Sequence, residues 1–168
     1  GFPPTPEMIQ VVAQKSQLYF PSTHYKLYKK LEAEHIPQFC QAYQAHLISD
    51  IQLKRKFKVA IDGLNGSAGE CAVHILEKLG CDVIALRCDA NGEFPDHAPD
   101  PSKEQNLEKL KCAVQQHEAD IGIALDGDGD RLVILDEKAK LISADQLLSL
   151  ISEICLKTHP NSEIVFDV

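Results

Sequence analysis

Hydrophobic residues recur along the chain with two different periods, and the period changes near residue 57. Before that point apolar positions are three or four residues apart, the spacing of amphipathic helices. We expect three short helices there, separated by prolines: one after Thr5, a second between Ser22 or Thr23 and Glu34, and a third from Pro37. This spacing therefore predicts that residues 1–55 form a helical segment.

From residue 57 onward, short apolar runs alternate with amphipathic stretches. The runs are typical of buried strands, and they cover residues 57–61, 81–86, 119–125, 132–135 and 163–168. Strand–helix–strand alternation predicts an α/β domain over residues 56–168, with a mostly parallel sheet and helices on both faces.

Three helices are expected between these strands. Gly80 is suited to end the first, and Ser102 to cap the second. The third spans about residues 144–157 and carries an apolar face expected to point inward, formed by Leu147, Leu148, Ile151, Ile154 and Cys155.

Charge divides the chain in the same way. Residues 1–58 contain 8 Lys or Arg against 4 Asp or Glu, whereas residues 59–168 contain 9 against 21. An acidic body repels phosphate backbones, so nucleic acid is not an expected partner. No apolar run approaches the ~18 residues that span a bilayer, and the first residues do not have the pattern of a signal peptide. The charge pattern does not indicate an oligomeric state.

Six cysteines occur without any Cys-x-x-Cys pair. Most occupy positions in apolar periodic stretches, so we interpret them as buried free thiols of a reducing compartment. The cytoplasm is the expected location.

The strongest chemical signal is the sequence Asp126-Gly127-Asp128-Gly129-Asp130-Arg131, here called the metal loop. Three carboxylates at alternate positions repel one another unless a cation neutralises them. The intervening glycines let the backbone curl so that the carboxylates converge. Hard oxygen ligands select Mg²⁺, Ca²⁺ or Mn²⁺. Asp126, Asp128 and Asp130 are therefore predicted to bind a divalent cation, with Mg²⁺ favoured.

A calcium-binding EF-hand is a second interpretation of the same residues, because Glu137 occupies the twelfth position counted from Asp126. Position six is Arg131, however, where that loop needs glycine, and the flanking segments have the pattern of strands. The EF-hand is therefore disfavoured.

Arg131 has two interpretations at this level. It either balances the charge of the acidic loop or reaches a phosphate held beside the metal, since guanidinium binds phosphate bidentately. The spacing alone favours neither.

A glycine-containing turn over residues 62–69 joins a strand to a helix, and Asp89 follows twenty residues after Gly69. This spacing is close to a dinucleotide fingerprint without matching it, so a nucleotide-binding module is a rival interpretation. Close helix–strand packing explains the glycines better. His97, in a proline-rich loop, is either a ligand or a structural residue, and the structural role is favoured.

Together these residues resemble the α-D-phosphohexomutase family, which includes phosphomannomutase and phosphoglucomutase. Four ordered segments carry the resemblance: residues 59–66, 92–101, 126–131 and 164–168. The resemblance implies that residues 56–168 form the second, metal-binding domain and run into the first strand of a third. It implies that residues 1–55 end the first domain.

The resemblance also implies the chemistry. The three aspartates would hold Mg²⁺ against a phosphoserine that passes its phosphoryl group to a hexose phosphate, and Arg131 would lie by the reacting phosphate. The family's phosphoserine segment, Thr-Ala-Ser-His-Asn-Pro, does not occur in this sequence. We therefore expect a chain that binds metal but does not turn over substrate alone.

Overall fold

The computed structural model describes residues 5–19 and 36–166 and divides the chain into two compact units, residues 1–38 and 39–168. Helix α1 (Pro6–Tyr19) begins after Thr5, whose hydroxyl accepts a hydrogen bond from the Met8 amide at 3.4 Å. This confirms the first expected helix. The second, over 22–34, lies outside the described residues.

The third expected helix is α2 (Ile36–Ile48). Its residues from Phe39 onward belong to the same compact unit as the sheet. Among residues 40–48 of this helix, Gln44 is the buried position, and its carboxamide oxygen accepts a hydrogen bond from Lys78 Nζ at 2.9 Å. The compact α/β unit thus begins earlier than the segment boundary expected after residue 55.

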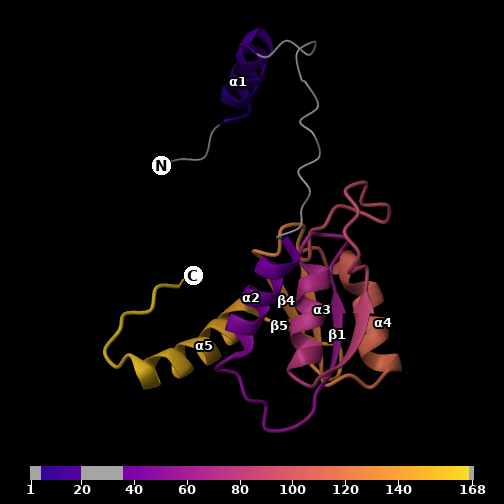
Figure 1. The fold of residues 1–168 in the computed structure, drawn as a ribbon, viewed down its shortest axis with the longest axis vertical. Coiled ribbons are helices and arrows are strands. Elements are labelled where there is room, and N and C mark those ends of the chain that lie inside the picture. Colours follow the sequence, from indigo (N-terminus) through magenta and orange to yellow (C-terminus); the bar gives the residue numbers. More distant parts are fainter. Residues whose placement is uncertain (1–4, 20–35, 167–168) are drawn as a thin grey trace. The chain divides into compact units, whose positions relative to one another are not determined.

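A five-stranded sheet forms the centre of the second unit, with strand order β2-β1-β3-β4-β5 (Figure 1). Strands β1 (Lys58–Asp62), β2 (Asp82–Leu86) and β3 (Ile121–Leu125) are parallel, whereas β4 (Leu132–Leu135) and β5 (Leu141–Ile142) are antiparallel to their neighbours. The α/β class is confirmed. The six-residue connection 126–131 is too short for a parallel crossover, which explains the direction of β4. Strand β5 was not expected.

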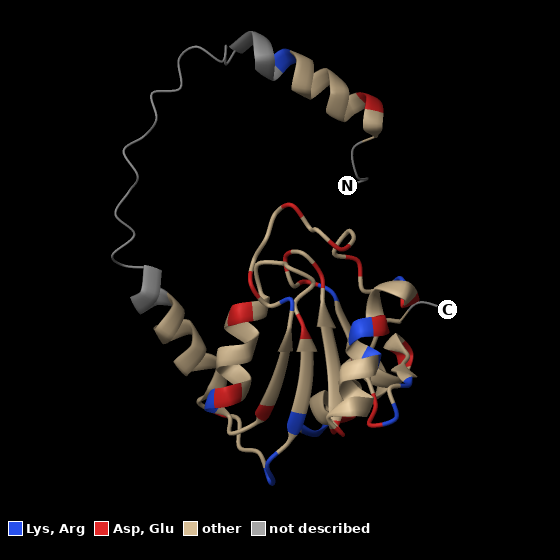
Figure 2. Cartoon of the chain, turned by 90° about the vertical axis from the view of Figure 1, so that its right-hand side faces the viewer, with Lys and Arg blue, Asp and Glu red and all other residues tan. Residues whose placement is uncertain are grey.

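Helices cover both faces of this sheet, as expected. Helix α3 (Gly69–Lys78) connects β1 to β2, and α4 (Glu108–Gln116) connects β2 to β3 on the other side of β1. Because right-handed crossovers in opposite directions place their helices on opposite faces, the sheet lies between α3 and α4 (Figure 2). Gly80, with φ 86°, follows the last turn of α3 and confirms the expected end of that helix.

The start of α4 differs from expectation. A 3₁₀ helix, η2 (Glu104–Leu107), precedes it. The Ser102 hydroxyl donates a hydrogen bond to Asp100 Oδ1 at 2.6 Å and caps no helix. An N-cap serine must accept a hydrogen bond from a backbone amide of the helix, but the helical turn begins after Lys103 and no side chain caps it, so the Ser102 prediction was wrong.

The core lies between α4 and the sheet. It is formed by small and branched side chains, whose largest members are Leu107, Leu110, Val114 and Leu135. Ala60 of β1 and Ala124 of β3 are fully buried beneath them. This packing holds the carboxyl ends of β1 and β3 side by side, where the candidate site lies.

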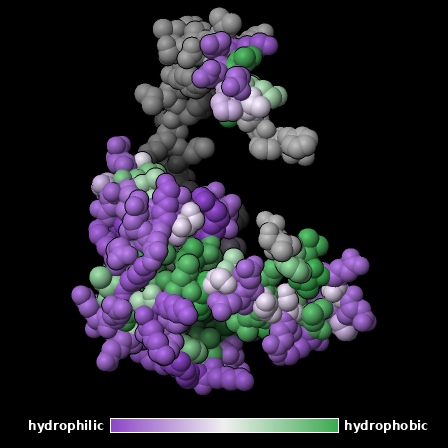
Figure 3. All heavy atoms as spheres, turned by 180° about the vertical axis from the view of Figure 1, so that it is seen from behind, coloured by the Kyte–Doolittle hydropathy of each residue, from purple (hydrophilic) through white to green (hydrophobic). Residues whose placement is uncertain are grey.

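Helix α5 (Ala144–Thr158) begins with a capping box between Ser143 and Gln146. Its apolar face packs less than expected. Leu147 and Leu148 are half-buried, but Ile151, Ile154 and Cys155 are exposed. An open groove of about 280 Å³ lies between α5 and strands β4 and β5, and Figure 3 shows this apolar surface in green. The apolar face of α5 is thus only partly covered by the residues that the structure describes.

Two further expectations need revision. Residues 163–166 form no strand, and the rest of the expected strand 163–168 lies outside the described residues. The six cysteines are free, as expected, but none is buried: Cys40, Cys112 and Cys155 are exposed and the others half-buried. No helix within the described residues is long and apolar enough to cross a membrane.

Candidate metal centre

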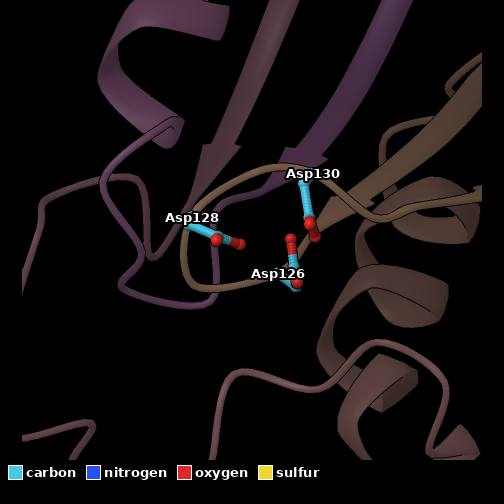
Figure 4. A group of neighbouring side chains, drawn as sticks. All are labelled: Asp126, Asp128 and Asp130. Atoms are coloured by element: carbon cyan, nitrogen blue, oxygen red, sulfur yellow. The ribbon is translucent and has the colours of Figure 1, made fainter. Parts of the chain in front are cut away.

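The metal loop leaves the carboxyl end of β3 and returns as β4. Asp126 directly follows β3 and is only 2% exposed, whereas Asp128 and Asp130 lie on the exposed part of the loop. One carboxylate oxygen from each residue lies within 4.8 Å of the others. Figure 4 shows the three side chains directed toward a common space inside the loop. The structure thus brings together the three aspartates identified in the sequence.

The glycine turn after β1 supports the metal loop from beneath. The Ser67 amide donates a hydrogen bond to the Gly127 carbonyl at 2.9 Å. A Cβ at Gly66 would lie 2.7 Å from that same carbonyl oxygen and 2.8 Å from the Asp126 carbonyl oxygen. The turn and the loop therefore approach each other backbone to backbone, which only glycine permits at residue 66. This close packing accounts for the glycine and removes the main support for a nucleotide-binding turn.

Arg131, the last residue of the loop, is bonded to Asp126. Its amide donates to Asp126 Oδ1 at 3.0 Å, and its Nε donates to Asp126 Oδ2 at 2.7 Å. The Arg131 side chain nevertheless remains 62% exposed. The same guanidinium lies 3.7 Å from Asp130 Oδ1 and 3.7 Å from Asp100 Oδ1. Arg131 therefore balances the acidic loop while keeping an accessible face.

The electrostatics of the loop differ between its members. The charges of Asp128 and Asp126 raise the pKa of Asp130 above its ordinary value. Burial of Asp126 raises its pKa, but the hydrogen bonds from Arg131 outweigh burial, and the net effect is a lowered pKa. The raised pKa of Asp130 thus reflects repulsion by the neighbouring carboxylates, which a cation would relieve.

The proline-rich loop, residues 91–101, forms the third side of the site. Pro99 packs against the metal loop, since its Cγ would lie 3.0 Å from a Cβ at Gly127. Asp100 lies next to it, bonded to the Ser102 amide at 3.1 Å. Figure 2 shows acidic residues in the loops at the carboxyl ends of the parallel strands. Three loops from distant parts of the sequence thus meet around the aspartates.

Arg87, at the end of β2, holds the proline-rich loop in place and was missed in the sequence. Its guanidinium is paired with Asp62, which is fully buried at the end of β1. Its Nη1 lies 3.2 Å from Asp96 Oδ2 and 2.6 Å from His97 Nε2, and its Nη2 donates to the Asn106 carbonyl at 3.1 Å. Asp62 could have indicated this pair in the sequence, because a carboxylate at the end of a buried strand requires a charged or hydrogen-bonding partner.

His97 belongs to this network. Its Nδ1 lies 2.9 Å from the Ala98 carbonyl oxygen, so Nδ1 carries the proton, and Nε2 accepts from Arg87. These contacts are consistent with the structural role favoured from the sequence.

The donor set fits a hard divalent cation. Three carboxylates contribute oxygen ligands, which Mg²⁺ and Ca²⁺ both accept. Two β-strands flank the loop, so the helix–loop–helix of an EF-hand is excluded. Three ligands leave positions on an octahedral ion open to water or phosphate oxygen.

Comparison with known proteins agrees with this arrangement. Residues 37–140 match the family described as phosphoglucomutase/phosphomannomutase, alpha/beta/alpha domain II. The match covers more than half of the chain and includes the whole metal loop. The chain therefore belongs to the phosphoglucomutase/phosphomannomutase family, with residues 37–140 matching its second domain, which confirms the resemblance seen in the sequence.

Individual relatives support the same assignment. A phosphomannomutase/phosphoglucomutase of Pseudomonas putida is 44% identical over 126 residues, which cover 75% of this chain and 27% of the relative. A phosphoglucomutase of Neisseria meningitidis is 41% identical over the same shares. The chain thus spans about a quarter of the length of these relatives.

Solved structures show the same fold. A phosphoglucomutase/phosphomannomutase family protein from Burkholderia thailandensis is 36% identical, with a TM-score of 0.69 over 72% of this chain and 26% of that protein. A phosphomannomutase from Thermus thermophilus, described as putative, has a TM-score of 0.61 at 19% identity over 71% of this chain and 29% of that protein, and it supports the fold alone.

Proposed function

We propose that this chain supplies the Mg²⁺ site of a phosphohexomutase, an enzyme that moves a phosphoryl group within hexose phosphates. The observation that carries this proposal is the convergence of Asp126, Asp128 and Asp130 within 4.8 Å at the carboxyl end of β3. Membership of the family supports the reaction class, because its relatives bear the names phosphomannomutase and phosphoglucomutase. The substrate of the full-length protein would accordingly be a hexose phosphate, and the compartment the cytoplasm.

Each residue has a distinct part in this proposal. The three aspartates would hold the cation, which offsets negative charge on a transferring phosphoryl group. Arg131 keeps an accessible guanidinium beside them, suited to the oxygens of the reacting phosphate. The phosphoserine of the family would come from outside residues 1–168. The sequence placed the end of the first domain at residue 55, but the match to domain II begins at residue 37, so the boundary would lie near residue 37 and the chain would enter the third domain at its end.

Titration calorimetry with MgCl₂ tests the metal assignment. We expect weak binding to the chain, because phosphoserine contributes no ligand here, and we expect Asp128→Asn to reduce it strongly. Glu137→Gln is the matched control, since it removes the same charge from the exposed residue that an EF-hand would use as its twelfth position. Equal Mg²⁺ binding by the wild type and Asp128→Asn, or loss of binding in Glu137→Gln alone, would refute the assignment.

A further inference from the structure

Arg131 hydrogen-bonds the buried carboxylate of the metal loop, Asp126. Asp126 is the one buried aspartate of the three, and both of its oxygens accept hydrogen bonds from Arg131, at 3.0 Å from the amide and 2.7 Å from Nε. The backbone contact belongs to the fold of the loop. The side-chain contact does not, because the Arg131 side chain is 62% exposed.

A second acceptor for the same guanidinium lies across the site. Asp100 Oδ1 is 3.7 Å from Arg131 Nη1, beyond a hydrogen bond but within the range of an ion pair. Asp100 is held in position by the Ser102 amide and hydroxyl, at 3.1 Å and 2.6 Å, and its backbone carbonyl accepts from Asn106 Nδ2 at 2.8 Å. Asp100 is therefore a fixed acidic group beside Arg131, and its Oδ2 also lies 3.8 Å from Lys103 Nζ.

We propose that Arg131 is an exchangeable counter-ion of the metal loop: it pairs with Asp126 in the metal-free chain and transfers to Asp100 when a divalent cation binds. The inference rests on the proposed metal site. A cation bound by Asp126, Asp128 and Asp130 would lie close to Nε, and two positive charges at this distance repel each other. Arg131 thus lowers the affinity for the cation and ends, after binding, with its guanidinium turned toward the proline-rich loop.

This exchange gives the metal loop two useful properties. Without metal, the three carboxylates keep a cationic partner, so the loop retains its shape. With metal, the freed guanidinium is a donor fixed at the rim of the site, where a phosphate held on the cation could be bound bidentately. Arg131 acts in this scheme as a positioning residue whose location reports whether metal is bound.

The Mg²⁺ dissociation constant at fixed ionic strength measures this competition. Arg131→Gln removes the charge but keeps a hydrogen-bond donor, and we expect Mg²⁺ to bind about three- to tenfold more tightly. Arg131→Lys keeps the charge and should remain within about twofold of the wild type. Lys138→Gln removes the same charge from an exposed turn away from the site and should change little. Thermal unfolding in EDTA identifies any variant that fails to fold.

A double-mutant cycle tests the transfer to Asp100. Asp100→Asn removes the receiving charge, so it should weaken Mg²⁺ binding in the wild type more than in Arg131→Gln, and the two changes should be non-additive. The Arg131 Nε resonance should also shift on adding MgCl₂. Unchanged or weaker binding in Arg131→Gln, or strict additivity in the cycle, would overturn the exchange. Those results are distinct from failure of the metal site itself, in which no Mg²⁺ binds to the wild type.

Discussion

Arg87 and Asp62 form a buried ion pair that joins the carboxyl ends of β2 and β1. Arg87 Nε donates to Asp62 Oδ1 at 3.0 Å, and Nη2 donates to Asp62 Oδ2. The Arg87 side chain is 10% exposed and that of Asp62 is fully buried. Burial alone would lower the pKa of Arg87, but the bonds and charges of Asp62 and Asp96 raise it. The guanidinium therefore stays charged, and each partner supplies the other's main buried polar contact.

Removing Arg87 should destabilise the chain strongly. Arg87→Met leaves the Asp62 carboxylate buried without its counter-charge, and breaking a buried pair in this way costs about 3–5 kcal/mol. Urea denaturation followed by circular dichroism measures the change. The control is Lys109→Met, which removes an ion pair with Asp96 in which both side chains are exposed. It should shift the urea midpoint only slightly. Equal midpoints for the two variants would show that the Arg87 pair does not stabilise the fold.

Gly66→Ala should displace the metal loop. An added Cβ would lie 2.7 Å from the Gly127 carbonyl oxygen and 2.8 Å from the Asp126 carbonyl oxygen. Both oxygens belong to the backbone and cannot rotate away as a side chain could. We expect at least about a tenfold loss of Mg²⁺ affinity, since misplacing a ligand set by about 1 Å has effects of this size or larger. Gly92→Ala is the matched control, because a Cβ there meets no atom within 4 Å. Comparable Mg²⁺ affinity in both variants would mean that the turn does not support the loop.

Asp130 should make stability depend on pH and metal. Its pKa is raised by Asp128 and Asp126, so the folded chain binds this proton more tightly than the unfolded chain does. The resulting penalty is present above the raised pKa and is relieved as the pH falls through it. In EDTA at neutral pH, Asp130→Asn should therefore be more stable than the wild type, and its advantage should shrink on acidification.

Magnesium should reverse that order. The cation binds the folded wild type and stabilises it by mass action, whereas Asp130→Asn has lost a ligand. Thermal unfolding of both proteins, with EDTA and with MgCl₂, measures the reversal. Glu137→Gln carries the same charge change outside the cluster and should show neither effect. A wild type that is more stable than Asp130→Asn in EDTA would contradict the repulsion among the three carboxylates.

The sequence by itself determined the fold class and located the proposed metal site. Asp126, Asp128 and Asp130 are recognisable because ligand chemistry, spacing and intervening glycines lie within six consecutive residues. The strands β1 to β4 and helices α3 and α5 are recognisable because burial of one face imposes a period on the residues themselves. The ligand spacing and the hydrophobic period are both properties of residues that are close together in the sequence, so they can be recognised without the structure.

The tertiary structure decided which distant residues meet. The partner of Asp62 is 25 positions away, and the acceptor offered to Arg131 comes from the proline-rich loop. It also left Ile151 and Ile154 exposed on α5. Such pairings depend on how crossover connections bring strand ends together and on which acceptor is nearest in space. The spacing of residues along the chain does not encode either.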